Sequence, residues 1–232
     1  LASVESGSVL SDLISVLPEN SVELQKTYRF DADIKSLAAR VNQGDIDAVW
    51  HQLQDPAVSN ISLTPADPIS CIAARYHLFM EKVQRQPTGD MAGIFRAFAR
   101  FQVLCAVHYG SRGVTGINRR VELHLARQGF ACEPDGWYSG RPVLITSNDY
   151  RLDLFNGDIG ICMKDESNGE SKVWFQRGDG SLKGYSPWRL PSCETVYAMT
   201  IHKSQGSEFD EVLVLLPEGD NRILSRELIY TA

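Results

Sequence analysis

The residue types that bind phosphate and ribose gather in a short segment near the end of the chain. Residues 198–210 read AMTIHKSQGSEFD, so hydroxyls, an imidazole, an ammonium, an amide and a carboxylate occur close together. Hydroxyls, lysine and free backbone N–H groups suit phosphate contacts, and a carboxylate suits a ribose hydroxyl. Strand-like hydrophobic runs at 195–201 and 211–216 flank the segment, which places it where ligands of α/β sheets collect. A polar surface turn is the alternative interpretation.

Two other segments carry residues with related chemistry. The pair Tyr28–Arg29 combines an aromatic face, which accepts any base, with a guanidinium that can bind phosphate bidentately. Residues 108–114 form a glycine-containing loop with Arg112, ahead of a predicted helix that contains Asn118. A loop at a helix N-terminus can bind DNA phosphates. Both segments are also compatible with purely structural roles, as a short chain run and a connecting loop.

The loop at 108–114 belongs to a predicted α/β unit. Residues 101–107 form a near-continuous apolar run, which is typical of a buried parallel strand, and residues 115–128 have helical character up to Gly129. A short helix or turn is predicted at 8–17, and a short strand at 59–63. Further helices are predicted at 33–54 with a break near Gly44, 68–86, 91–99 and 225–232. We interpret the apolar stripe of 68–86 as ordinary core packing.

The pattern changes between residues 137 and 190, where short segments alternate with turn signals. The turns are Asn156-Gly157, Asn168-Gly169 and Asp179-Gly180, and the predicted strands are 142–146, 159–163, 171–176 and 181–185. Closely spaced short strands of this kind indicate a small antiparallel barrel. Because α/β character resumes afterwards, we expect the barrel to be an insertion.

Composition sets wide limits on function. The 232 residues are 43% hydrophobic and carry a net charge of −6, so a basic nucleic-acid-binding composition is absent, although a local basic groove remains possible. The five cysteines and five histidines show no metal-ligand spacing, and free thiols in a reducing cytoplasm are expected. No apolar run reaches the ~20 residues of a membrane helix. The start at Leu1 is not a signal peptide and suggests a piece of a longer chain.

The segment at 198–210 closely resembles motif V of superfamily 1 DNA helicases of the RecD family, the alpha subunit of exodeoxyribonuclease V. This resemblance implies that Thr200 and His202 touch the backbone of single-stranded DNA and that Lys203 and Ser204 lie beside it. It also implies that Gln205 and Gly206 sit near the γ-phosphate of ATP, with Gln205 in a catalytic role, and that Glu208 hydrogen-bonds the ribose.

Two more segments resemble the same family. Residues 24–30, LQKTYRF, are similar to motif IV, which implies that Tyr28 stacks on adenine and that Arg29 reaches the γ-phosphate as a catalytic residue. The loop at 108–114 and Asn118 resemble the family's DNA-contacting loop, except that His108 stands where relatives often carry Arg and Ile117 replaces Leu. Arg112 is close enough to supply the phosphate contact instead. The chain ends resemble the tail of motif III and the lead-in to motif VI.

The resemblance implies a RecA-like second motor domain of α/β class with an inserted Src-homology-3-like β-barrel. We expect residues 1–17 to be a tail of the first motor domain or a linker, and residues 18–136 and 193–232 to be the two parts of the second motor domain. Residues 137–192 would be the barrel, whose seven Lys or Arg and seven Asp or Glu leave no basic groove.

Parts of a complete ATP site are missing from the chain. It has no Gly-x-x-x-x-Gly-Lys-Ser/Thr loop, no acidic strand for Mg²⁺ and no motif VI arginine, so ATP and Mg²⁺ are expected only in the full-length protein and this piece alone is predicted to be inactive. The resemblance implies a cytoplasmic 5′-to-3′ helicase that works with the RecB and RecC subunits in double-strand-break repair and DNA degradation, the nuclease chemistry belonging to RecB. A stand-alone RecD-like helicase, the helicase half of a relaxase and a non-catalytic docking module are the alternatives.

Overall fold

The computed structural model describes residues 9–20, 22, 31–64, 67–85, 90–165, 168–219 and 221–232. Contacts along the chain group it into two compact units, one formed by Leu1–Ala66 with Asp220–Ala232 and the other by Asp67–Gly219. The predicted four-part division of the chain stays a prediction.

The first unit is helical in its described part. It contains α1 (Val9–Val16), the 3₁₀ turn η1 (Pro18–Asn20), α2 (Ala32–Gln43), α3 (Ile46–Gln54) and α7 (Arg226–Thr231). Helix α2 ends at Gly44, which adopts a left-handed φ of 75°, so the predicted break in 33–54 is confirmed. Helix α2 packs against both α3 and α7. The Ser225 hydroxyl caps α7 by accepting from the backbone N–H of Leu228.

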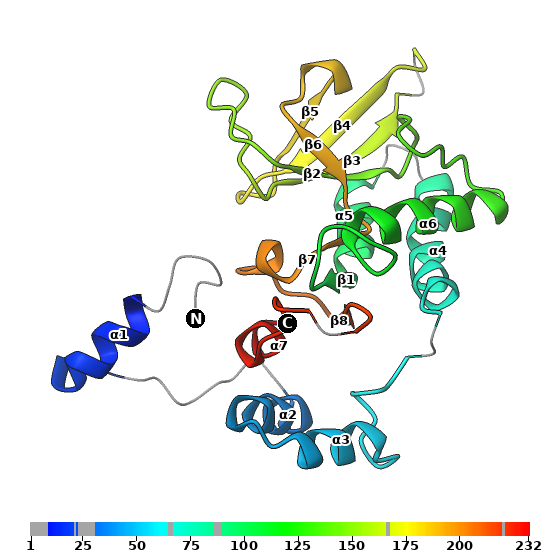
Figure 1. The fold of residues 1–232 in the computed structure, drawn as a ribbon. Helices are drawn as coiled ribbons and strands as arrows, with labels where there is room; N and C mark the ends of the chain where they lie inside the picture. The colour runs from blue at the N-terminus through cyan, green and yellow to red at the C-terminus, as the bar shows by residue number, and fades with distance from the viewer. Residues whose placement is uncertain are drawn as a thin grey trace. The chain divides into compact units, whose positions relative to one another are not determined.

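The second unit is built around a parallel sheet of three strands in the order β7-β1-β8 (Figure 1). Its central strand, β1 (Phe101–Cys105), is fully buried and pairs with β7 (Ala198–Thr200) and β8 (Glu211–Leu215). Helices α4 (Ile69–Arg85), α5 (Met91–Ala99) and α6 (Val114–Arg127) pack against these strands. Helices over a short apolar parallel strand are the expected arrangement of an α/β unit, and the predicted strand, loop and helix at 101–128 are confirmed.

Tyr76 shows how the sequence pattern of α4 builds the core. The apolar stripe predicted for this helix is buried, and Tyr76 within it is 1% exposed. The Tyr76 hydroxyl donates to the backbone carbonyls of Tyr197, at 2.6 Å, and Phe101, at 3.3 Å. Its ring also packs edge-on against the ring of Tyr197. One side chain therefore fixes α4 to β1 and to the residue before β7, and satisfies its own buried hydroxyl.

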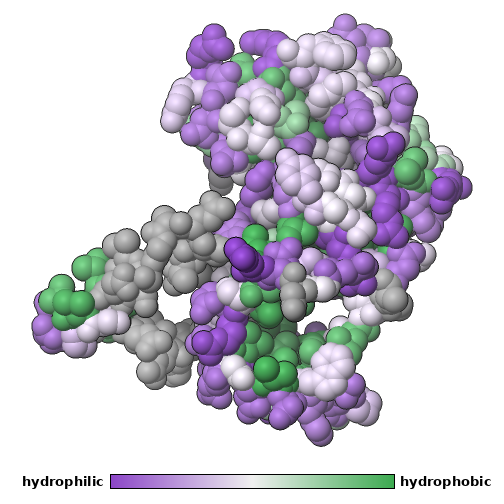
Figure 2. Space-filling model, viewed as in Figure 1, coloured by the Kyte–Doolittle hydropathy of each residue, from purple (hydrophilic) through white to green (hydrophobic). Residues whose placement is uncertain are grey.

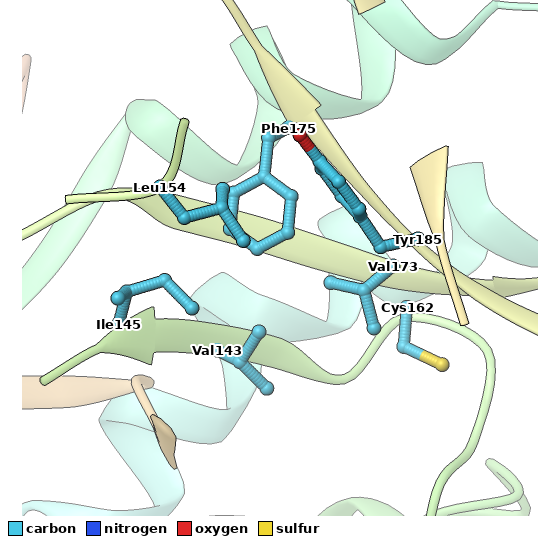
Figure 3. Packing of buried hydrophobic residues seen from close by; sticks show 7 residues of the cluster. All are labelled: Val143, Ile145, Leu154, Cys162, Val173, Phe175 and Tyr185. Carbon is cyan, nitrogen blue, oxygen red and sulfur yellow. The ribbon is translucent and has the colours of Figure 1, made fainter. Parts of the chain in front are cut away.

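A second sheet of five antiparallel strands lies between α6 and β7 in the chain. Its order is β5-β4-β3-β2-β6, formed by β2 (Pro142–Ile145), β3 (Ile159–Lys164), β4 (Ser171–Gln176), β5 (Leu182–Tyr185) and β6 (Cys193–Thr195), with the 3₁₀ turn η2 (Pro187–Arg189) before β6. Its core includes Val143, Ile145, Leu154, Val173 and Phe175, which point toward one another in Figure 3. The antiparallel insertion is thus observed. Closure into a Src-homology-3-like barrel is not shown, because the pairing runs from β5 to β6 as an open order.

Two predicted strands turned out differently. The run at 195–201 was expected to be one strand, but Cys193–Thr195 pairs with β2 in the antiparallel sheet while Ala198–Thr200 pairs with β1 in the parallel sheet. Val196 and Tyr197, both fully buried, carry the chain from one sheet to the other. The expected strand at 59–63 is irregular chain. A short apolar run does not reveal its pairing partners, which explains both errors.

The surface shown in Figure 2 is a mixture of hydrophilic side chains and smaller hydrophobic areas. Within the described ranges, every helix is too short or too polar to cross a lipid bilayer. All five cysteines are free thiols, and burial raises the pKa of Cys105 to about 12. The Cys105 sulfur therefore belongs to the packing rather than to a reactive site.

Candidate nucleotide and DNA site at the carboxyl edge of the parallel sheet

The carboxyl ends of the three parallel strands meet at one edge, and two of the sequence-predicted segments follow directly from them. Cys105 at the end of β1 lies opposite Thr200 at the end of β7 and Leu215 at the end of β8. The loop at 106–113 continues from β1, and the segment at 201–210 continues from β7. The structure therefore brings the glycine loop and the 198–210 segment to the same edge, where α/β sheets bind ligands.

The segment after β7 begins as a tight 3₁₀ turn, η3 (Ile201–Ser204). The Thr200 hydroxyl accepts from the backbone N–H of Lys203 at 3.4 Å, and the Ser204 hydroxyl donates to the Ile201 carbonyl at 2.8 Å. Ser204 is only 7% exposed. These hydroxyls shape the turn from within, so Ser204 is placed as a structural group rather than as a free phosphate donor.

The turn then opens into exposed chain. Gln205, Gly206, Ser207 and Glu208 are all exposed, and Gly206 has a left-handed φ of 87°. A glycine tolerates this conformation without steric cost and leaves the backbone open to a ligand. The three residues predicted to meet ATP on this segment therefore present themselves at the sheet edge.

Lys203 and His108 share a carboxylate that sequence reasoning did not single out. The Lys203 ammonium lies 2.6 Å from Oε1 of Glu194, and Nε2 of His108 lies 3.2 Å from Oε2 of the same residue. Glu194 belongs to β6 of the antiparallel sheet, opposite Leu144 of β2. Glu194 belongs to no sequence motif, so nothing in the sequence indicated that it would lie at the site.

Two glycines where the loop after β1 joins α6, Gly113 before the helix and Gly116 in its first turn, are required by close backbone approach. A Cβ on Gly113 would lie 2.4 Å from the Tyr109 carbonyl oxygen, and one on Gly116 would lie 2.3 Å from the Gly110 carbonyl oxygen. The His108 carbonyl accepts from both the N–H and the hydroxyl of Thr115. The loop is thus folded tightly onto the first turn of α6. Any side chain at these glycines would push it off the helix.

Arg112 of the same loop reaches the chain that follows the third strand. Its Nε lies 3.2 Å from Oε1 of Glu218, which comes just after β8, and the Arg112 side chain is 31% exposed.

Asn118 does not stand at the surface as the predicted DNA contact requires. It is 6% exposed, and its amide nitrogen donates to the carbonyls of Thr195 and Ala198 at 2.6 and 3.1 Å. Its amide oxygen accepts from the Ala198 N–H at 2.7 Å. Both the amide nitrogen and the amide oxygen of Asn118 are therefore used in hydrogen bonds to the backbone at β7. Asn118 therefore fixes the strand that carries the turn, because a buried backbone needs such partners.

Beneath the site, a buried polar network joins α6 to the antiparallel sheet. Glu122 of α6 is 3% exposed and accepts from the Tyr138 hydroxyl at 2.7 Å. Arg141 donates to the Thr195 hydroxyl and to the Gly136 carbonyl. Burial raises the pKa of the Glu122 carboxyl above its ordinary value, and the hydrogen bond from Tyr138 partly offsets this.

Tyr28 and Arg29 lie outside the described residues. His202 is half-buried, and its Nε2 has no hydrogen-bond partner among the described atoms. A buried ring nitrogen without a partner is the kind of group that a ligand can satisfy.

Comparison with known proteins bears on this arrangement. Residues 195–232, which include the turn after β7, match the UvrD-like helicase C-terminal domain. The RecBCD enzyme subunit RecD of Mycolicibacterium smegmatis is 38% identical over 237 residues, which cover 100% of this chain and 41% of that protein. The same subunit of Mycobacterium tuberculosis H37Rv is 36% identical over 239 residues, again with 100% and 41% covered.

The chain belongs to the RecD family. It spans about two fifths of the length of these RecD relatives. The ATP-dependent RecD2 DNA helicase of Deinococcus radiodurans is 32% identical over 133 residues, covering 56% of this chain and 18% of that protein. Among solved structures, Bacteroides Pif1 bound to ssDNA aligns with 100% of this RecD-family chain and 56% of its own, at 13% identity and a TM-score of 0.49.

Proposed function

We propose that this chain is part of an ATP-dependent DNA helicase subunit of the RecBCD type, a 5′-to-3′ motor that acts with RecB and RecC in double-strand-break repair and DNA degradation. The observation that carries the proposal is the meeting of two RecD-like segments, the loop after β1 and the turn after β7, at one edge of a parallel sheet. Loops at this edge can contact a nucleotide and a DNA strand together.

On the DNA side, we assign the phosphate contacts to Thr200, His202, Lys203 and Arg112. Lys203 and Arg112 are only partly exposed, but their charged ends lie on loops of the sheet edge. Cationic side chains and backbone N–H groups there can follow a phosphate backbone without reading its bases. Asn118 and Ser204 act on DNA binding indirectly, since they hold β7 and the η3 turn in shape.

On the nucleotide side, we assign Gln205, Gly206 and Glu208, together with Tyr28 and Arg29, to the cleft that the first motor domain would complete. The exposed Gln205–Glu208 chain and the open backbone at Gly206 fit a phosphate and a ribose. ATP and Mg²⁺ supply the phosphoryl group and its charge neutralisation when bound. This chain would contribute positioning by Gln205, ribose binding by Glu208 and charge stabilisation by Arg29.

The antiparallel sheet completes the proposed architecture. We assign it to a small Src-homology-3-like barrel that interrupts a RecA-like second motor domain. Its insertion between α6 and β7 and its separate core support this assignment.

Site-directed variants of the full-length protein test the nucleotide side. Arg29→Ala and Glu208→Ala should each lower the DNA-stimulated ATPase kcat, Arg29→Ala by at least about 100-fold, because a guanidinium on the transferred phosphate supplies a large part of the stabilisation. Glu211→Gln, at the opposite edge of the sheet, is the matched control and should retain normal activity. Normal unwinding by both site variants would remove the proposed assignments.

A stand-alone helicase is the second candidate, favoured by the likeness to the RecD2 helicase over 56% of the chain. Co-purification of the full-length protein with RecB and RecC separates the two. A non-catalytic docking module would instead show no salt-dependent binding of single-stranded DNA at all.

A further inference from the structure

The Glu194 carboxylate lies against the Lys203 ammonium. Without this carboxylate, the ammonium would meet a phosphate with its full charge. Both carboxylate oxygens are used, one by the Lys203 ammonium at 2.6 Å and the other by His108 at 3.2 Å. The side chains are partly shielded, with exposures of 26% for Glu194, 30% for Lys203 and 33% for His108. At such distances and exposures the ammonium and the carboxylate form a nearly neutral pair.

The strand geometry explains why Glu194 faces this cluster. Alternate residues of a strand point to opposite faces, so Glu194 and its neighbour Thr195 diverge. Thr195 accepts from Arg141 on the side of the buried Glu122 network, whereas Glu194 reaches Lys203 and His108. The inserted sheet thereby places one negative charge between two loops of the parallel sheet.

The imidazole adds a second constraint. A carboxylate only accepts hydrogen bonds, so Nε2 of His108 must carry the proton in this contact. Nδ1 of His108 is buried with no partner among the described atoms. Glu194 therefore fixes both the orientation of the ring and the loop after β1 that carries it.

We propose that Glu194 is a positioning residue that masks the charge of Lys203 and so weakens the grip of this edge on single-stranded DNA. This inference rests on the proposed function, because it takes Lys203 to face the DNA backbone. A phosphate that approaches Lys203 meets the Glu194 carboxylate beside it and must share or displace that contact. A motor that steps along a strand has to release each phosphate, and an internal competitor makes release easier.

The test is equilibrium binding of a single-stranded oligonucleotide to the full-length protein at several salt concentrations. Glu194→Gln keeps the shape and an acceptor oxygen but removes the charge. It should tighten binding about fivefold at ~0.1 M salt and steepen the slope of log K against log salt by about 0.7, the value for one more neutralised phosphate on a single strand. The double variant Glu194→Gln/Lys203→Met should bind no better than Lys203→Met alone, since the gain passes through Lys203.

The controls separate this inference from the proposed function. Glu211→Gln removes the same charge from an ion pair of the same length, 2.6 Å to Arg75, at the amino edge of the sheet, and should leave the slope unchanged. Unchanged or weaker binding by Glu194→Gln, or an equal gain from Glu211→Gln, would overturn the masking role. If Lys203→Met binds as well as the wild type, the DNA-facing role of Lys203 itself is wrong.

Discussion

At the scale of single residues, several side chains near the site act on the backbone rather than on a ligand. Asn118 is the clearest case, since one amide serves the N–H and carbonyl of Ala198 and the carbonyl of Thr195. An asparagine at the start of a basic helix predicts a surface contact when only its neighbours in sequence are considered. Burial to 6% exposure turns the same residue into a support for β7.

Asn118→Ala should destabilise the region around β7 without changing the salt dependence of DNA binding. The truncation leaves buried backbone groups of residues 195 and 198 unpaired, which costs about 2–4 kcal/mol. Hydrogen exchange of the β7 and α6 amides in the full-length protein should report this loss. The salt slope of DNA binding should stay at the wild-type value. Asn60→Ala, which removes one exposed hydrogen bond to Asp31, is the control. A lower salt slope for Asn118→Ala would instead indicate that Asn118 contacts a phosphate directly.

Two glycines where the loop after β1 joins α6 give a second prediction. Gly113→Ala and Gly116→Ala should each cost about 1–3 kcal/mol and weaken DNA binding, because the new Cβ meets a carbonyl oxygen at 2.4 or 2.3 Å. Thermal unfolding and oligonucleotide titration would measure both effects. Gly178→Ala has open space around its Cβ and should change stability by less than about 0.5 kcal/mol. Equal effects at all three positions would show that backbone crowding is not the cause.

At the scale of elements, the segment from Cys193 to Thr200 joins the two sheets of the Asp67–Gly219 unit. Its first half pairs with β2 and its second half with β1. The Glu122 network lies at this crossover and links α6, Tyr138 and Thr195. A buried carboxylate at such a crossing is sensitive to pH, since burial disfavours its charged form.

Glu122→Gln should stabilise the protein at neutral pH and lose that advantage in acid. The folded-state pKa of Glu122 lies above its ordinary value of 4.5, because burial raises it. Its stabilising contribution is therefore fully present below about pH 4.5 and is lost as the pH rises through the folded-state pKa. Glutamine keeps an acceptor for Tyr138 but does not titrate. Between pH 4.5 and 8, the melting temperature of Glu122→Gln should exceed that of the wild type by an amount that increases with pH.

The exposed Glu133 supplies the control for this series. Glu133→Gln should follow the wild-type profile across the same pH range, because Glu133 is exposed to solvent. A pH-independent difference between Glu122→Gln and the wild type would mean that packing, and not titration, sets the effect.

At the scale of the whole molecule, the parallel and antiparallel sheets of Asp67–Gly219 share one compact unit. Tyr197 ties them together, as it packs against Tyr76 in the core and its hydroxyl meets Tyr138 and the Gly140 carbonyl. Groups this deeply buried and mutually hydrogen-bonded make the opening of one sheet expose the other. We therefore expect the two sheets to behave as one cooperative body.

Hydrogen exchange can test this cooperativity. The amides of β1 and β3 in the full-length protein should open with the same free energy. Tyr138→Phe should lower both by about 1–3 kcal/mol, because buried Glu122 and Tyr197 both lose their hydrogen-bond contact with the Tyr138 hydroxyl. Tyr150→Phe, at an exposed loop, should lower neither. Independent responses of β1 and β3 to Tyr138→Phe would contradict a single body.

Local sequence determined much of the framework. The strand at 101–105, within the predicted run 101–107, and the break at Gly44 rest on propensities and turn chemistry that operate within a few residues, and both were confirmed. The resemblance of the 198–210 segment to motif V indicated the RecD family from the sequence alone. The antiparallel character of the insertion was also readable, because Asn-Gly and Asp-Gly turns set hairpins locally.

Only the tertiary structure decided how distant residues meet. The division of 193–200 between two sheets depends on partners about 50 and 95 residues earlier in the chain. The burial of Asn118 and the charge pair of Glu194 with Lys203 depend likewise on contacts that no local pattern encodes. Secondary structure follows from short-range sterics, whereas the electrostatic state of a site follows from which elements the fold places side by side.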